Sequence, residues 1–232
     1  MNPVRRRKII ALIVSFAVVG GIVTLSVRLV GRLTPQFVRE TSAVHVPVDI
    51  AASATFQTIE VIGGWRLTVE AGDYNVDVTA AGDAPDDTRA SVRDGTLRLE
   101  APITRGPSDM RLTATVTMPD LSALAIAGGA DVQIRGIEAD RFELSVDGAA
   151  SVRASESRFG ELHVTVQGAT NIDFRDSLTV NAHVELDGAS NLSIRMDGGS
   201  LTGTLRGVGN VSWTGTAEES VRVEGIGRVR QQ

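Results

Sequence analysis

The sequence predicts an all-β fold, a β-solenoid similar to a parallel β-helix with coils of about 20 residues, preceded by one N-terminal transmembrane helix. Three observations predict it. A long apolar run follows a basic cluster at the N-terminus, apolar residues recur at every second position from residue 56 onward, and a glycine-led motif recurs through the C-terminal half. The chain of 232 residues is long enough to bury one sizeable core.

The N-terminal segment predicts a membrane anchor. Residues 9–27 carry no charge, and a helix of that length spans about 28 Å, close to the hydrocarbon core of a bilayer. Four basic residues at 5–8 favour an N-terminus in the cytoplasm. A cleaved signal peptide is the alternative, although its apolar region is normally shorter. We expect a cytoplasmic basic tail over 1–8, a transmembrane anchor over 9–30 and a tether over 31–55.

The remaining domain, residues 56–232, is expected on the outer side of a bacterial cytoplasmic membrane, either periplasmic or extracellular. Its charge and composition exclude several classes of protein. Residues 1–32 carry a net charge of +6, which leaves −11 on the other residues, so we expect no nucleic-acid partner. The chain contains no cysteine, which excludes a disulfide scaffold and cysteine-ligated metals. No phosphate-binding loop motif is present, and we expect no cofactor.

Residues 56–120 are expected to form an irregular opening portion of the domain that caps the first regular coil. They alternate apolar and polar residues without a fixed period. A tight hairpin is expected at Asp94-Gly95. Strands are predicted at 56–61, 65–69, 74–78, 97–99 and 112–118.

Regular coils are predicted over residues 121–230, where a glycine is followed by a small residue and, four positions on, by an aliphatic residue. Apolar residues also stand two and four positions before nearly every glycine, with polar residues between them, which predicts strands with one buried face. Parallel stacking of such coils would bury one continuous aliphatic column. The leading glycines are Gly128, Gly148, Gly168, Gly188, Gly207 and Gly225.

The leading glycines and the residues three positions after them are expected to shape tight corners. Glycine adopts backbone conformations that a side chain hinders. Short polar side chains bond to nearby backbone groups and suit turns, and stacked across coils they would form a hydrogen-bonded ladder. The expected ladder consists of Asp131, Ser151, Asn171, Asn191 and Asn210.

On these residues the chain resembles the putative auto-transporter adhesin head GIN domain family. The resemblance covers residues 56–230 and rests on the recurring Gly-small-x-[Asp/Asn]-Val pattern, on Phe56-x-x-Ile59-x-Val61-x-Gly63 and on Val69-x-x-Gly72-x-Tyr74. It implies an extracytoplasmic, β-helix-like domain without an established enzymatic activity or catalytic residues. Family repeats often read Gly-Ser-Gly-Asp, and this chain departs from that pattern by keeping the second glycine only at Gly209 and Gly227.

Two outward columns are the candidate interaction surface. Asp147, Gln167 and Asp187 precede their glycines by one position, and His163 and His183 precede theirs by five. Stacked coils would bring the two histidines within about one strand spacing of each other. A histidine pair can bind a metal, but we interpret this one as part of a solvated face and assign no metal or catalytic residue.

The function predicted from the sequence is a membrane-anchored, non-enzymatic interaction, adhesin-like or scaffold module of the bacterial cell envelope. Its expected partners are an envelope protein, a glycan or a second copy of the chain. The alternative is an envelope polysaccharide hydrolase or lyase that uses the outward acidic and histidine columns. Loss of binding without any turnover after substitution of Asp147 and Asp187 would favour the interaction module. Turnover of a polysaccharide that is abolished by His163→Ala would favour the enzyme.

Overall fold

A computed structural model describes residues 14–19, 22–27, 43–46, 48–49, 54–82, 84–102 and 112–232. The chain forms two compact units, residues 1–40 and 41–232. In the first unit β1 (Val14–Val19) pairs antiparallel with β2 (Ile22–Val27). The described part of the predicted transmembrane helix is therefore a pair of strands. Among the residues described, no helix has the length and apolar character needed to cross a membrane. The predicted tail at 1–8 and most of the tether lie outside the described residues.

The second unit begins with seven strands that belong to one mixed sheet. Neighbouring strands follow the order β3, β6, β9, β5, β8, β7, β4, so both β9 and β8 pair with β5. The bounds of these strands are β3 (Ala43–His45), β4 (Val48–Asp49), β5 (Thr58–Ala71), β6 (Asn75–Ala81), β7 (Arg89–Arg93), β8 (Thr96–Glu100) and β9 (Leu112–Met118).

The long strand β5 organises this opening part. Its first half runs parallel to β8, and its second half runs parallel to β9. The predicted strands at 56–61 and 65–69 therefore join into one strand through Gly63, which has φ +99°. Two separate strands cover one edge of β5, whereas a single strand, β10 (Ala123–Arg135), covers the other edge.

A tight hairpin sets the relative direction of β7 and β8. The predicted hairpin at Asp94-Gly95 is confirmed, because β7 and β8 pair antiparallel around it and both turn residues have positive φ. A short connection returns the chain beside the strand it has just left, and this geometry requires antiparallel pairing. β6 also runs antiparallel to β3 and to β9, although long stretches of chain, and no tight hairpin, separate it from both.

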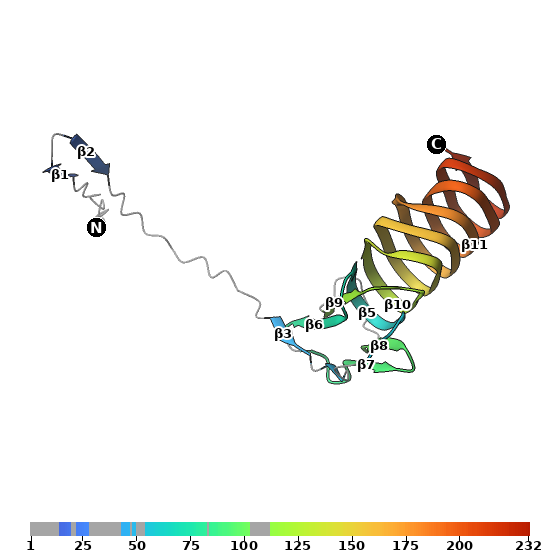
Figure 1. The fold of residues 1–232 in the computed structure, drawn as a ribbon, viewed down its shortest axis with the longest axis horizontal. Helices are drawn as coiled ribbons and strands as arrows, with labels where there is room; N and C mark the ends of the chain where they lie inside the picture. The colour runs from blue at the N-terminus through green and yellow to red at the C-terminus, as the bar shows by residue number, and fades with distance from the viewer. Residues whose placement is uncertain are drawn as a thin grey trace, which may run out of the picture. The chain divides into compact units, whose positions relative to one another are not determined.

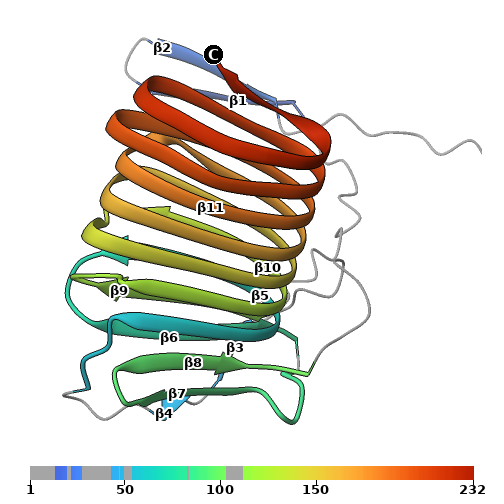
Figure 2. The same ribbon diagram turned by 90° about the vertical axis from the view of Figure 1, so that its right-hand side faces the viewer.

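The remaining chain is one strand of 94 residues, β11 (Glu138–Gln231), which curls around the core repeatedly (Figures 1 and 2). We call each stretch from one of the six leading glycines to the next a winding. β10 runs parallel to residues 143–155 of β11 with a shift of 20 residues, so Leu124 faces Leu144 and Gly128 faces Gly148. The glycine spacing in the sequence thus equals the shift between these paired strands.

Close approach between neighbouring windings explains why the leading positions hold glycine. A Cβ atom at Gly168 would collide with the carbonyl oxygen of Gly148, and one at Gly188 would collide with that of Gly168. The φ angles of Gly128, Gly148, Gly168, Gly188 and Gly207 lie between +102° and +137°, a region that L side chains rarely adopt. The chain bends at these positions, and its backbone pairing with the next winding continues through them.

One continuous apolar core fills the interior of the second unit. Most predicted inward residues of β10 and β11 are buried, and Leu124, Leu144 and Val164 are each 1% exposed, whereas Val223 in the last winding is 37% exposed. Phe142, Phe159 and Phe174 come from three successive windings, with ring centroids 5.0 and 5.7 Å apart. This core includes residues from Val46 to Trp213.

The predicted fold class is wrong. The molecule is all-β, but the domain is one curled sheet of mixed strand direction and not a β-solenoid of equivalent parallel coils preceded by a transmembrane helix. The opening part places antiparallel strands in the same sheet that the windings extend. The sequence pattern reports which side chains are buried, and this is the same for parallel and antiparallel neighbours.

Candidate interaction surface

The strand segments that precede the leading glycines carry the predicted interaction residues on their outer side. Before Gly148, Leu144 and Val146 are buried whereas Glu143 and Asp147 are exposed, as the two-residue period of a strand requires. We call the outer side of these segments on β11 the acidic face. Its charged residues, histidines and glutamine are Arg141, Glu143, Asp147, Glu161, His163, Gln167, His183, Glu185, Asp187, Arg206, Glu218, Arg222 and Glu224.

The structure brings the first predicted column together. Asp147, Gln167 and Asp187 each precede a leading glycine by one residue, and the glycines of these three windings lie directly over one another. All three side chains are exposed. Gln167 and Asp187 line a shallow hollow of about 90 Å³ together with Glu185 and Arg206.

The column continues beyond the residues that the sequence predicted. Arg206 holds the same position one winding after Asp187, and Glu224 follows one winding later. The Arg206 Nε and Glu224 Oε2 atoms are 3.2 Å apart. The signal that would have identified both residues is their place directly before Gly207 and Gly225.

The two histidines of the second predicted column are neighbours, as expected. Their ring centroids are 5.9 Å apart and the ring planes are tilted by 48°. His163 Nε2 lies 4.0 Å from Glu161 Oε2, and His183 Nε2 lies 3.6 Å from Glu185 Oε1. Each ring thus has its own carboxylate. Within the described part of the chain no group of three or more His, Cys, Asp or Glu side chains is arranged to hold a metal ion.

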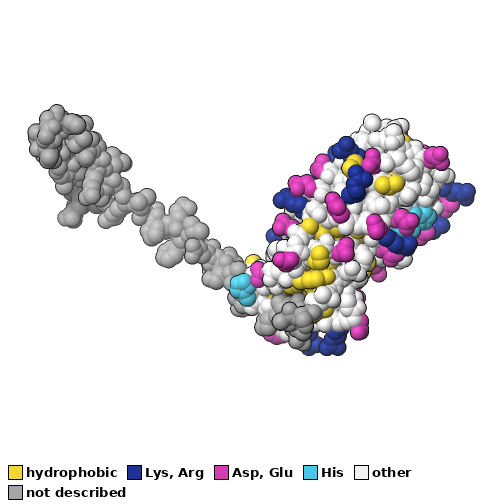
Figure 3. All heavy atoms as spheres, in the orientation of Figure 1, with side chains coloured by type: hydrophobic (Ala, Val, Ile, Leu, Met, Phe, Trp, Pro, Cys, Tyr) yellow, Lys and Arg dark blue, Asp and Glu magenta, His cyan; other side chains and the backbone are white. Residues whose placement is uncertain are grey.

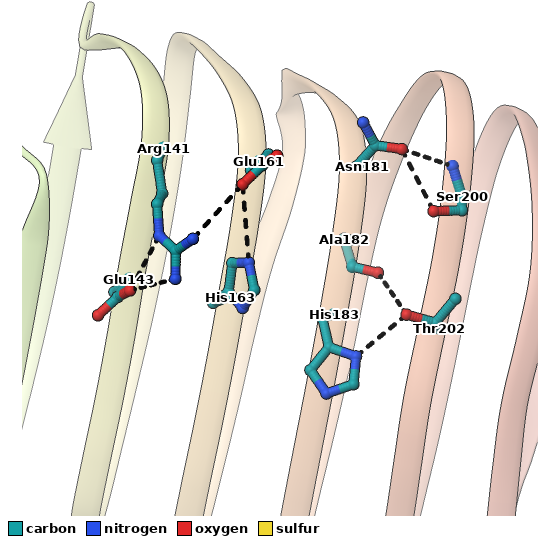
Figure 4. A network of polar contacts seen from close by, with 9 residues as sticks. All are labelled: Arg141, Glu143, Glu161, His163, Asn181, Ala182, His183, Ser200 and Thr202. Atoms are coloured by element: carbon teal, nitrogen blue, oxygen red, sulfur yellow. Dashed lines mark hydrogen bonds and ion pairs between the residues drawn. The ribbon is translucent and has the colours of Figure 1, made fainter.

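Polar contacts around the histidines connect neighbouring windings (Figure 4). Arg141 pairs with Glu143 on its own strand at 2.6 Å and reaches Glu161 on the next winding at 3.6 Å. His183 Nδ1 lies 3.1 Å from Thr202 Oγ1, also one winding away. Exposed pairs of this kind contribute little stability each, about 0.2–1 kcal/mol. Together they order the side chains of the acidic face.

A second charged surface lies on the strand segments that follow the leading glycines, and sequence reasoning missed it. We call the outward side chains within seven positions after a leading glycine on β10 and β11 the basic face. Its signal in the sequence is arginine three, five or seven positions after a leading glycine. Its charged residues are Asp131, Arg135, Arg153, Asp173, Arg175, Arg195, Arg228 and Arg230.

Asp173 is the best-partnered carboxylate of the basic face. Arg175 donates to both of its oxygens, from Nε at 2.9 Å and from Nη2 at 2.7 Å, and Arg153 lies 3.8 Å away. The hydrogen bonds from the Arg175 side chain hold the pKa of Asp173 below its usual value, although partial burial opposes this. The same pairing raises the pKa of Arg175.

The predicted column of turn residues runs along the basic face, within strands. Asn210 Nδ2 donates to Asn191 Oδ1 at 3.1 Å, which is one rung of the expected ladder. Asp131 instead lies 3.9 Å from Arg66 on β5. A buried rung lies one position nearer the glycines, where Thr170 Oγ1 donates to Ser190 Oγ at 3.2 Å.

Both faces consist of side chains that stand on a rigid sheet and point into solvent. Figure 3 shows acidic, basic and histidine side chains interspersed on one side of the molecule, with apolar side chains visible between them. His163 and His183 are 37% and 45% exposed, and the carboxylates beside them are more than half exposed. Such an arrangement can bind an extended, oppositely charged surface through many weak contacts.

Comparisons with known proteins identify a family and structures of similar fold. The family described as putative auto-transporter adhesin, head GIN domain, matches residues 55–217. A crystal structure of a putative adhesin from Bacteroides fragilis is similar with a TM-score of 0.55 at 17% identity, covering 82% of this chain and 96% of that one. A putative adhesin from Parabacteroides distasonis gives 0.48 at 14% identity, with the same coverage of each chain. No curated protein matches the chain. The first of these likenesses supports the fold alone.

Proposed function

Because the chain belongs to the putative auto-transporter adhesin head GIN domain family, we propose that it is a non-enzymatic, adhesin-like binding module of the bacterial cell envelope. The acidic face is its binding surface, and a molecule that presents basic groups is its partner. The observation that carries the proposal is the order of this face. Successive windings present carboxylates and histidines in fixed columns on a rigid sheet.

Binding fits this surface better than catalysis does. General acid–base catalysis requires groups that converge on a reacting atom, usually in a site from which water is excluded. On the acidic face His163 and His183 each have a separate carboxylate, and all four side chains are at least a third exposed. An array of this kind can attract a charged partner without holding a reacting atom.

The N-terminal sequence supports a location in the envelope. The uncharged run at 9–27 follows four basic residues, and the rest of the chain beyond residue 32 carries a net charge of −11. Basic residues beside an apolar segment favour the cytoplasmic side of the membrane. Attachment through this segment would leave the acidic domain on the outer side, where envelope proteins and glycans are present.

The test is crosslinking of the full-length chain in cells, followed by mass spectrometry of what co-purifies. Three versions are compared: wild type, the acidic-face variant Asp147→Asn/Asp187→Asn, and the control Glu138→Gln/Asp140→Asn. The control removes two exposed carboxylates that lie outside the acidic face. We expect the acidic-face variant to lose a reproducible partner at least fivefold and the control to retain it.

Two outcomes would contradict the proposed function. Equal recovery from all three versions would show that the acidic face does not bind the partner. Hydrolysis or cleavage of an envelope polysaccharide by the wild type, lost in His163→Ala, would show an enzyme instead. Circular dichroism of each purified version confirms that the substitutions leave the fold intact.

A further inference from the structure

The two charged faces of the windings carry opposite net charge. The acidic face has seven carboxylates against three guanidinium groups, whereas the basic face has six guanidinium groups against two carboxylates. Just beyond the basic face, Glu156 and Asp176 line a hollow together with Arg135 and Arg153. Both carboxylates of the basic face already have arginine partners, Asp131 with Arg66 and Asp173 with Arg175. The chain as a whole has a net charge of −5, which conceals this division.

The two faces also share one geometry, because the same windings form both. Along each segment the outward residues recur every second position, about 6.6 Å apart, and neighbouring windings are separated by about 4.8 Å. The faces meet at the leading glycines, beside which Ala149, Ala169 and Ala189 are exposed. Side chains of the two faces on two molecules of the same chain therefore stand at the same spacings.

We propose that the partner of the acidic face is the basic face of a second copy of this chain. This inference rests on the proposed function and identifies the occupant of the same surface. Complementary potentials steer two surfaces together and fix their register. Since a different surface is used on each copy, the contact is heterologous and can continue from copy to copy into a row. Charges on these faces are solvated, so salt weakens the contact.

The absence of cysteine from the chain allows a direct test. Ser145 and Ser151 lie on the two sides of Gly148, and both are exposed, the first on the acidic face and the second on the basic face. The full-length Ser145→Cys and Ser151→Cys chains carry different tags, are mixed in vesicles and are treated with a short bifunctional thiol reagent. A third chain, Thr216→Cys, places an exposed thiol outside both faces and measures random collision.

We expect the mixture of Ser145→Cys and Ser151→Cys to crosslink at least fivefold more than either variant alone or than mixtures with Thr216→Cys. Adding Asp147→Arg and Asp187→Arg to the first chain should remove that excess. Adding Arg153→Glu and Arg195→Glu to the second chain should then restore it. We also expect about 1 M salt to remove the excess crosslinking, because salt screens the charges of the two faces.

Equal crosslinking in every combination would overturn the inference. So would an excess of crosslinking that the charge reversals leave unchanged. Preferred crosslinking of Ser145→Cys with itself would also overturn it, since that result indicates like faces in contact. The proposed function has a separate test, because it predicts only that the chain captures some partner in cells. A captured protein other than this chain, together with no excess crosslinking, would leave the proposed function standing and reject the second copy.

Discussion

The opening part of the second unit and the windings build one sheet by different means. In the opening part, the turn at Asp94-Gly95 fixes the relative direction of β7 and β8, and one edge of β5 pairs with two short strands, β8 and β9. In the windings, glycine spacing fixes the register, so identical positions of successive stretches face each other. The comparison shows that columns of equivalent surface residues arise in the windings, where the glycine spacing is regular. The acidic and basic faces are consequences of that register.

Removal of a core aromatic ring should have the largest effect and should test whether the two parts share one core. Phe159 lies between Phe142 and Phe174 in the windings, and Leu99 lies in the opening part; both are fully buried. We expect Phe159→Ala to reduce the free energy of unfolding by about 4 kcal/mol and Leu99→Ala by about 3 kcal/mol. Denaturant titration should show one transition in each case, and two separate transitions would show that the parts unfold independently.

A methyl group at a leading glycine should be nearly as damaging. Gly168→Ala requires φ +137° and drives Cβ into the carbonyl oxygen of Gly148, so we expect a loss of about 3 kcal/mol. The matched control is Gly82→Ala in the opening part, where φ is +92° but no atom lies within 4 Å. It should cost only about 1–2 kcal/mol. Equal losses in thermal or denaturant unfolding would refute the role assigned to close approach.

A gain of stability is expected at Glu156. This residue has φ +54°, and it occupies the position that Gly136, with φ +70°, holds one winding earlier. Glu156→Gly should therefore stabilise the fold by about 1 kcal/mol. In the opening hairpin Asp94 has φ +49°, but aspartate tolerates this conformation better, so Asp94→Gly should gain less. A smaller gain at Glu156 than at Asp94 in urea unfolding would contradict this account.

The smallest effect is a pH dependence on the basic face. Arg175 lowers the pKa of Asp173 in the folded chain relative to the unfolded chain. Ionised Asp173 therefore stabilises the fold above its usual pKa, and this contribution disappears as the pH falls through the lowered folded value. We expect Asp173→Asn to cost up to about 1 kcal/mol at pH 7 and progressively less below about pH 4. A cost that is constant with pH would exclude the ionised pair as its source.

Burial was the part of the structure that the sequence predicted well. Alternation placed Leu144 and Val146 inside and Asp147 outside, and the spacing of 20 residues placed His163 beside His183. Both results depend on local periodicity, which a single sequence displays directly. The hairpin at Asp94-Gly95 was recognisable for the same reason, since its two residues determine it.

Strand direction in the opening part could not be predicted in the same way. Gly63 faces Gly128 and has a positive φ like the later glycines, but it precedes Gly128 by 65 residues rather than 20. The inserted strands β6 to β9 hide this relationship, because they contribute buried faces without a repeating spacing. The alternation of apolar and polar residues in these strands does not indicate which strands pair with each other.

The basic face was missed for another reason. The residues before each glycine include carboxylates and histidines, which suggest a binding surface. The arginines after the glycines alternate with asparagines and serines, which are typical of turns. Arg153, Arg175 and Arg195 stand out only after Asn171 and Asn191 are placed within strands. Their common side follows from the register and not from any local motif.

The central claim is that glycine register assembles the acidic face from distant parts of the chain. Pulsed electron paramagnetic resonance on the full-length Asp147→Cys/Glu224→Cys chain measures this directly, since the chain has no other cysteine. The two positions lie four windings apart in one column, so the account predicts backbones separated by four strand spacings, about 19 Å, and a single narrow distribution allowing for the label arms. A broad distribution, or one centred well beyond about 35 Å, would contradict it.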